Sequence, residues 1–331
     1  MPIDEHLDPW DEVRAGREFS GILVGNGASR AVWNRFEYGS LYEVARDHNI
    51  IHRLTPPDVA LFDALNTRNF EYVLAALATA RRVNEALAIP APVIHDRYAS
   101  IQQALVEAVR TTHVPWANVP ADVLEAIRSA LLDYRFVYST NYDLLIYWAV
   151  MYEGGDGFKD FFWAPNFDPG NTELWGKATG VFYLHGALHL YRTLRGRTLK
   201  RAAGIGLNLL DLFGTEPEPG ATPLFISEGA AEDKAESIHR SDYLTFAYTQ
   251  LAHHDGPLCI FGHSLGDVDQ HIVDAIRRAG IRDIACSLRH GPREAVIASK
   301  ANIIAKLPEA NLLFYDAATH PLGSPDLRIA P

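Results

Sequence analysis

The sequence predicts an α/β fold: a Rossmann-like open, mostly parallel sheet with a helical insertion after the first strand. Two observations predict it. Short apolar runs, typical of strands that helices cover on both faces, alternate with helical patterns along the chain. Polar motifs directly follow four of these runs, where the carboxyl ends of parallel strands would meet at one sheet edge. Ligands bind along that edge in open α/β sheets.

The composition bounds the kind of protein. The chain has 331 residues, of which 48% are hydrophobic and 21% charged, which suffices for the core of one large domain or two modest ones. No run of about 18 uncharged apolar residues occurs, so no membrane span is predicted. Residues 1–10 are acidic and lack the basic-then-apolar order of a signal peptide. We therefore expect a cytoplasmic protein.

Charge and cysteine content bear on three classes of site: nucleic-acid sites, zinc sites and disulfides. The formal net charge is −11, and the basic residues form no long stripe. Because contacts to phosphates supply most non-specific affinity, we expect no direct nucleic-acid binding. The two cysteines, Cys259 and Cys286, form no CxxC pair, which excludes a zinc site of four cysteines and a disulfide framework. Both are expected to be buried thiols.

The expected elements form one domain over residues 1–331. The strand candidates are residues 20–24, 136–139, 181–184, 223–227, 258–261, 283–287 and 312–315. Residues 41–133 contain too much helix for one crossover and are expected to form a helical insertion or module. Its helices are predicted from residue 56 onward and at residues 70–87, 98–110 and 120–132. Residues 154–180 and 192–220 are expected to be irregular, as lids or binding loops are.

The first motif, Gly25-Asn26-Gly27-Ala28-Ser29, follows the first strand and precedes a helix. Glycines here let the backbone approach a pyrophosphate, and a helix N-terminus favours its negative charge. Arg30 stands where the dinucleotide-binding pattern has its third glycine. A tight turn without a ligand is the alternative.

The second motif is Thr140-Asn141-Tyr142-Asp143, after the strand at residues 136–139. The amide of Asn141 can orient a water or hold a ribose hydroxyl. Asp143 can cap the next helix or bond back to Asn141, and a helix cap without further function is the alternative.

The third motif, Leu184-His185-Gly186, places a histidine at a strand end. His185 can act as a general base near neutral pH, and Gly186 leaves space beside it for a substrate. A structural histidine is the alternative. The other histidines have no comparable context in the sequence, and His271 is expected on the helix after Asp267.

The fourth motif, Gly262-His263-Ser264-Leu265-Gly266-Asp267, contains the GxSxG pattern of the α/β-hydrolase nucleophile elbow. Three observations weigh against a hydrolase. The stretch after Ser264 is short for an acid, a histidine and the remaining strands, and no HGGG-type oxyanion loop is visible. Asp267 and Asp269 follow at once, where a hydrolase helix is usually apolar. In a hydrolase triad with Ser264, the acid would be Asp283 or Asp316 and the histidine would be His320.

Taken in order, GNGAS, STNYD, YLHG and FGHSLGDVD resemble the motifs of the sirtuin-like family, in the divergent bacterial branch that lacks the zinc module. The resemblance implies a Rossmann-like sheet that binds NAD as a substrate at its C-terminal edge, without zinc. It implies that Asn141 and His185 are catalytic and that Ser264 contacts phosphate or ribose. The other NAD-binding residues that it implies are Gly25, Gly27, Ala28, Ser29, Thr140, Asp143, Gly262 and Asp267.

The departures from that family narrow the expected activity. The deacetylase branch carries two CxxC pairs, which are missing here, and its acyl-lysine channel cannot be recognised. The resemblance therefore implies an NAD glycohydrolase that releases nicotinamide and ADP-ribose or a cyclised form. Zinc-free relatives look like NAD-consuming effectors of bacterial anti-phage defence, which implies a homo-oligomer or a complex with a second defence protein.

Two other functions stay open on the sequence. One is a fold that binds NAD or ADP-ribose without turning it over, as a sensor or partner-binding module. The GxSxG pattern leaves a serine hydrolase that uses Ser264.

Overall fold

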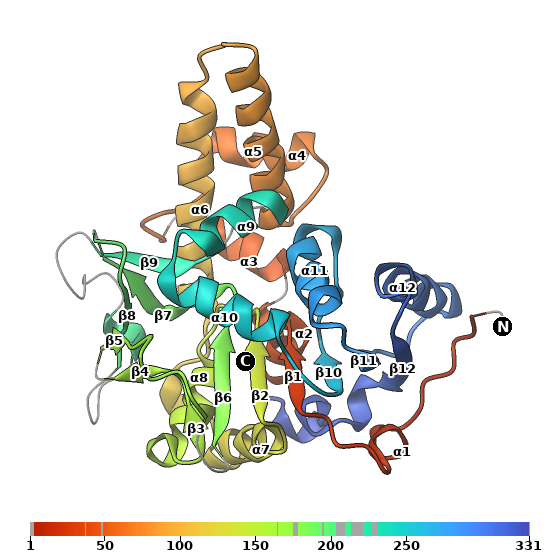
Figure 1. Cartoon of the computed structure of the whole chain (residues 1–331). Helices are drawn as coiled ribbons and strands as arrows, with labels where there is room; N and C mark the ends of the chain where they lie inside the picture. Colours follow the sequence, from red (N-terminus) through yellow and green to blue (C-terminus); the bar gives the residue numbers. More distant parts are fainter. Residues whose placement is uncertain are drawn as a thin grey trace.

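The main sheet of the computed structural model is parallel throughout. The structure describes residues 3–36, 38–47, 49–163, 165–174, 178–193, 195–202, 209–212, 221–226 and 231–330. Seven strands pair in the order β12-β11-β10-β1-β2-β6-β3, with helices on both sides (Figure 1). They are β1 (Gly21–Val24), β2 (Phe136–Ser139), β3 (Phe158–Lys159), β6 (Thr179–Tyr183), β10 (Leu258–Phe261), β11 (Asp283–Leu288) and β12 (Asn311–Asp316). The predicted Rossmann-like α/β class is confirmed.

The central strand β1 sets the position of the site. In the register of the sheet, Val24 lies between Ser139 of β2 and Phe261 of β10. The chain runs from β1 to β2 on one side and later returns to β10 on the other side of β1. This reversal of strand order makes the carboxyl ends of β1 and β10 a topological switch point, where a crevice for ligands opens in such sheets.

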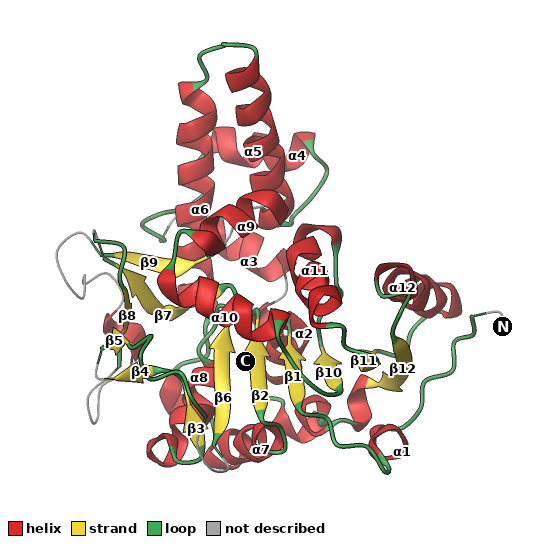
Figure 2. Ribbon diagram, in the orientation of Figure 1, coloured by secondary structure: helices red, strands yellow, loops and turns green. Residues whose placement is uncertain are grey.

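A second, antiparallel sheet was not predicted. Its five strands are β4 (Phe162–Trp163), β5 (Asn166–Phe167), β8 (Thr198–Lys200), β7 (Gly186–Arg192) and β9 (Thr222–Phe225), in that order, and Figure 2 shows them beside the β6 side of the main sheet. The expectation that residues 223–227 belong to the parallel sheet is therefore wrong, because β9 pairs with β7 in antiparallel register. The segments 154–180 and 192–220, expected to be irregular, contribute β3, β4, β5 and β8. Residues 203–208, 213–220 and 227 lie outside the described part.

Most of the helix lies between β1 and β2. There the chain forms α2 (Asn26–Val32), α3 (Tyr38–Ala45), α4 (Pro56–Ala64), α5 (Phe70–Ala86), α6 (Pro92–Thr112) and α7 (Ala121–Leu132). Helix α6 begins at Pro92, earlier than predicted, because proline suits the first turn of a helix. Helices α5 and α6 form a hairpin that stands away from the sheet (Figure 1).

The remaining helices flank the sheet and its ends. They are α1 (Trp10–Arg14), α8 (Leu145–Met151), α9 (Ala231–His239), α10 (Asp242–Ala252), α11 (Gln270–Ala279) and α12 (Arg293–Lys306). Helices α9, α10 and α11 pack against one another, with α10 and α11 in front of the sheet in Figure 1. Among the described helices, none has both the length and the apolar composition that a membrane span requires.

The apolar runs and the two cysteines are buried in the core of the main sheet. Ile22 and Leu23 of β1 are fully buried, and Tyr138 of β2 stacks on Phe182 of β6 with ring centroids 5.2 Å apart. Cys259 lies in the same core, where burial raises the pKa of its thiol to about 12. Both cysteines are buried and unpaired, as the sequence predicts.

Backbone contacts between the loop after β1 and the loop after β10 hold the two loops together at the switch point. The Gly25 N–H donates to the Phe261 carbonyl at 2.9 Å, and the Gly27 N–H donates to the Gly262 carbonyl at 2.8 Å. A Cβ on Gly27 would lie 2.6 Å from the Gly262 Cα, and Gly262 itself has a φ of +67°. Glycine at both positions is therefore a steric requirement.

We predict that Gly27→Ala lowers the free energy of unfolding by about 1–3 kcal/mol, because backbone at both loops must move to admit a Cβ. Urea denaturation followed by circular dichroism measures the loss. Gly291→Ala is the matched control, since a Cβ there meets no atom within 4 Å. An equal effect of both substitutions would contradict the steric argument.

Candidate functional site

A cavity of about 1130 Å³ opens at the carboxyl edge of the main sheet, around the switch point. It is larger than the roughly 300–1,000 Å³ of most small-molecule pockets. Among the residues predicted from the motifs, Gly27, Thr140, Asn141, Asp143, His185, Gly262 and Ser264 line it. All four motifs thus contribute to one cavity.

Asn141 is held in one orientation by the first motif. Its Nδ2 donates to the Gly25 carbonyl at 3.1 Å and to the Ser29 hydroxyl oxygen at 2.8 Å. Ser29 in turn donates its hydroxyl proton to Asp143 Oδ2 at 2.5 Å. The amide oxygen of Asn141 is buried and has no hydrogen-bond partner within the described structure. Since an unpaired buried acceptor is costly, this oxygen is prepared to receive a donor.

The helix-cap interpretation of the second motif is also correct in part. Asp143 Oδ1 accepts the N–H of Leu145 at 2.9 Å, at the start of α8. The N–H of Leu144 donates to Nε2 of the buried His113 at 2.8 Å. Asp143 therefore has a structural role in addition to its place in the cavity wall.

Four of the predicted NAD-binding residues do not line the cavity. Gly25, Ala28 and Ser29 lie behind its wall, where they shape the turn and hold Asn141. Asp267 points outward: its side chain is 98% exposed and its Oδ1 pairs with Lys306 Nζ at 2.6 Å. The turn after Gly266 directs this carboxylate away from the cavity, which Asp269 lines instead.

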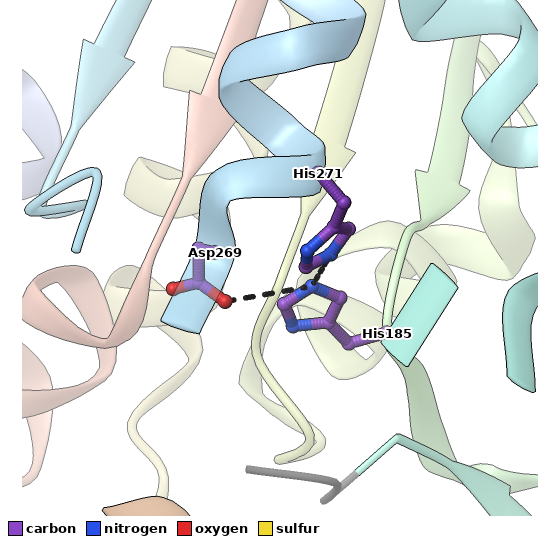
Figure 3. A group of neighbouring side chains, drawn as sticks. All are labelled: His185, Asp269 and His271. Carbon is purple, nitrogen blue, oxygen red and sulfur yellow. Dashed lines mark hydrogen bonds and ion pairs between the residues drawn. The ribbon is translucent and has the colours of Figure 1, made fainter. Parts of the chain in front are cut away.

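His185 contacts a second histidine and an aspartate. Figure 3 shows the ring of His271 next to the ring of His185, and the Asp269 carboxylate to the left of the two rings. The Nε2 atoms of the two histidines are 2.8 Å apart, and Asp269 Oδ1 lies 3.9 Å from His185 Nε2. His185 lies in the turn between β6 and β7, whereas Asp269 occupies the N-cap position of α11 and His271 lies in the first turn of that helix. The expected position of His271 on this helix is confirmed.

Asp269 is the charged centre of this cluster. Lys234 of α9 donates to Asp269 Oδ1 at 2.8 Å, and His263 Nε2 lies 3.5 Å from Asp269 Oδ2. Burial raises the pKa of Asp269, but the Lys234 ammonium and the neighbouring histidines outweigh it and hold the pKa below its usual range. Burial, then the Lys234 charge, lowers the pKa of His185 well below its ordinary value. His185 is therefore neutral near pH 7, the form that can accept a proton.

Sequence reasoning missed His263, Asp269, His271 and Lys234 as partners of His185. The statement that the other histidines lack context is wrong for His263 and His271. The Asp-x-His spacing at a helix start, directly after the fourth motif, was a signal that could have identified Asp269 and His271. Lys234 gave no such signal, because its helix reads AEDKAESIH and resembles a solvated surface helix.

Three of these side chains could hold a metal ion. His185, Asp269 and His271 each offer one ligand atom, all within 4.8 Å of one another. Two observations disfavour a metal here. The Nε2 atoms are at hydrogen-bonding distance, and the fully buried Lys234 ammonium already occupies the Asp269 oxygen that a cation would take. A divalent ion would add charge beside a buried ammonium with one carboxylate to balance both.

Ser264 lacks the geometry of a hydrolase nucleophile. In a nucleophile elbow the helix follows the serine directly, whereas α11 begins only at Gln270. The positive φ angles of this loop fall on Gly262 and Leu265, at 67° and 51°, rather than on Ser264. His320 is also engaged elsewhere: its Nε2 contacts the Tyr134 hydroxyl at 3.1 Å, and its Nδ1 accepts the N–H of Leu322 at 3.1 Å.

The rest of the cavity has two different walls. Its apolar wall comes from helices between β1 and β2 and the turn before them, through Phe36, Leu41, Phe70, Leu105 and Val109. Its polar wall lies beyond β11 and β12 and includes Arg289, His290 and Arg328. Arg289 also donates to the Gly27 carbonyl at 3.4 Å, which brings a guanidinium beside the glycine turn. The cavity therefore combines a cationic end with an apolar end.

Comparisons with known proteins place the chain in a family. A family model described as a domain of unknown function, DUF4917, matches residues 22–321. No curated protein matches the chain. A solved structure of a Sir2 homologue in complex with NAD is similar at 13% identity and a TM-score of 0.39, over 97% of this chain and 95% of that one. A mutant Sir2 homologue in complex with 2′-O-acetyl ADP-ribose is similar at 14% identity and a TM-score of 0.36, over 95% and 92%. Such low scores say nothing about the ligand of the present chain.

We expect a fluorophosphonate probe to leave Ser264 unmodified, because His320, the histidine of the hydrolase interpretation, has both ring nitrogens engaged elsewhere. Mass spectrometry of the treated protein measures the modification. Stoichiometric labelling that Ser264→Ala abolishes would contradict this expectation.

We also expect the free energy of unfolding to fall as the pH drops below about 6.5. Burial lowers the pKa of His271 from 6.5 to about 3, so the unfolded chain takes up a proton in this window and the folded chain does not. The stabilisation is complete above pH 6.5 and is lost towards pH 3. Each such histidine contributes a slope of about 1.4 kcal/mol per pH unit. Urea denaturation at several pH values should give a shallower slope for His271→Gln; an unchanged slope would contradict the assignment.

Proposed function

Since the chain belongs to DUF4917, a family whose description states no function, we propose a function from its site: it binds NAD and hydrolyses the bond between nicotinamide and ribose. One observation carries the proposal. Asn141 and His185 both line the cavity at the switch point of the sheet, together with the Gly27 and Gly262 turns. This combination supports a dinucleotide site with a polar acceptor and a base in the same wall.

The cavity supports the binding part of the proposal. Gly27 and Gly262 line the cavity at the switch point, and the Arg289 guanidinium beside Gly27 supplies positive charge that suits a pyrophosphate. The volume of about 1130 Å³ admits a ligand as long as a dinucleotide. We place the pyrophosphate at these turns and the nicotinamide ribose at Asn141 and His185.

The chemistry follows from the two polar side chains. The free amide oxygen of Asn141 accepts a hydrogen bond from a ribose hydroxyl or from the attacking water. The bond between C1′ and the pyridinium nitrogen breaks, its electron pair neutralises the nicotinamide, and an oxocarbenium-like ribose remains. Water adds to C1′ and gives its proton to neutral His185, from which it passes to solvent. The products are nicotinamide and ADP-ribose, or a cyclised form where a hydroxyl of the ligand replaces water.

The proposed biological role rests on the motif resemblance. Depletion of NAD would suit an effector of bacterial anti-phage defence that works as a homo-oligomer or with a second protein. Binding of NAD or ADP-ribose without turnover is the second candidate function. It is favoured by one observation, the hydrogen bond that already occupies Nε2 of His185.

We expect the purified chain to bind NAD and release nicotinamide, and Asn141→Ala and His185→Ala each to reduce release about 100-fold or more, the range in which positioned polar groups and acid–base groups contribute. Liquid chromatography of nicotinamide measures release, and calorimetry measures NAD binding. The matched controls are Asn118→Ala and His253→Ala, which replace the same residue types at exposed positions.

The outcomes separate the two candidate functions. Binding with release that the site variants lose supports hydrolysis. Binding without release in wild type supports the sensor. Release that persists in both site variants, or no binding of NAD, overturns the proposed site.

A further inference from the structure

A second imidazole lies behind His185, and the proposed reaction gives it no role. His271 is 4% exposed and is not among the residues that line the cavity, yet its Nε2 is 2.8 Å from Nε2 of His185 (Figure 3). Two neutral imidazoles at this distance share one hydrogen bond, in which one nitrogen carries the proton and the other does not. The contact therefore links the tautomer of His185 to that of His271.

We propose that His271 is a positioning residue for His185: it accepts the Nε2–H of His185, so that Nδ1 is the unprotonated nitrogen available to a ligand in the cavity. This inference rests on the proposed function, because it assigns the orientation of the base used there. The reason is stoichiometric. A neutral imidazole has one basic nitrogen, so His185 can take a proton at Nδ1 only in the tautomer that carries its hydrogen on Nε2, and the Asp269 carboxylate 3.9 Å from Nε2 favours that tautomer.

The proton balance is simple in this arrangement. Water that attacks C1′ gives one proton to Nδ1 of His185, which becomes an imidazolium with protons on both nitrogens. The Nε2–H stays on His185 and is hydrogen-bonded to His271 Nε2, so His271 does not change its protonation. The proton on Nδ1 then leaves to solvent through the cavity, and His185 returns to its starting tautomer.

Charges of opposite sign face His185: the Asp269 carboxylate favours this intermediate, and the Lys234 ammonium disfavours it. Asp269 Oδ1 is 3.9 Å from His185 Nε2 and offsets the positive charge of the imidazolium. Two further contacts fix the position of the Asp269 carboxylate. Lys234 Nζ of α9 donates to its Oδ1 at 2.8 Å, and His263 Nε2 of the loop after β10 lies 3.5 Å from its Oδ2. Helix α11 carries both Asp269 and His271, so one helix N-terminal turn sets the distance and the angle of both partners.

A metal ion is the competing interpretation of the same side chains. It would need the lone pairs of both Nε2 atoms and an oxygen of Asp269, which excludes a proton between the histidines. The hydrogen-bonding distance between the two Nε2 atoms and the buried Lys234 ammonium favour a shared proton over a metal ion. Elemental analysis therefore belongs in the test.

The first measurement needs no enzymatic activity. Nitrogen-15 spectra of the full-length chain with labelled histidines, assigned with His185→Gln, report which nitrogen of His185 carries the proton. We expect Nε2–H with ADP-ribose bound, and a large share of Nδ1–H in His271→Leu, where the acceptor is gone. His185 protonated at Nδ1 in wild type, both with and without ADP-ribose, would overturn the proposal. So would a His185 spectrum that His271→Leu leaves unchanged.

The second measurement is kinetic. His271→Leu should lower kcat for nicotinamide release about 10- to 100-fold and leave KM for NAD within about twofold, because orientation of the base is lost and the ligand contacts remain. His271→Gln, whose amide oxygen can accept the Nε2–H, should recover part of the loss. Equal kcat in wild type and His271→Leu would overturn the proposal.

Tyr248→Phe is the matched control for a merely structural role. The Tyr248 hydroxyl donates to the His271 carbonyl at 3.0 Å, so its removal disturbs the same turn without touching the imidazole. We expect it to change neither kcat nor the His185 spectrum. A stoichiometric metal ion in the purified protein that His271→Gln loses would also overturn the proposal. Absence of nicotinamide release in wild type would count against the proposed function alone, since the spectra still decide the role of His271.

Discussion

The backbone contact between the β1 and β10 loops is the constraint on which the site depends. Gly27 and Gly262 approach so closely that neither can carry a Cβ without displacing the other loop. This contact brings the turn after β1, the loop after β10 and, through the Gly25 carbonyl, the side chain of Asn141 into one rigid group. Because the three strands are parallel neighbours, their ends also lie at the same height. The edge is therefore organised before any ligand arrives, which lowers the entropic cost of binding.

The buried polar cluster around Asp269 has a different logic. The Lys234 ammonium and the imidazoles of His185 and His271 are buried there beside the partly buried Asp269 carboxylate, and replacing buried charged and polar groups with apolar ones is often neutral or stabilising. Stability thus gives little reason for the cluster. Its value is electrostatic: in a site of low dielectric constant, fixed charges and dipoles act more strongly on a reacting group than they would in water. Burial keeps His185 neutral and also strengthens the electrostatic effect of the neighbouring charges on it.

The sequence allowed the parallel sheet to be predicted far better than the rest. Strands such as Gly21–Val24 are buried on both faces, so their composition alone identifies them. The antiparallel sheet was missed because β4 and β5 are two residues long and carry no periodicity, and because β5 joins the rest of the sheet through β8, farther along the chain. The site residues also differ in how far the sequence predicts them. Asn141 and His185 follow directly from strand ends, whereas Lys234 lies on α9, which packs against α10 and α11, and no local pattern predicts its burial.

The helices between β1 and β2 account for the shape of the site. A doubly wound sheet by itself offers a crevice that is open to solvent, but here Leu41, Phe70 and Leu105 from α3, α5 and α6 close one side of it. These side chains are almost fully buried although they line a cavity, so the wall is packed from behind by the helical hairpin. An apolar wall excludes water from one side while Asn141 and His185 remain on the other. In the proposed reaction, competition between hydrolysis and cyclisation of an oxocarbenium-like ribose would depend on the access of water, so the length and packing of this hairpin would bear on the product.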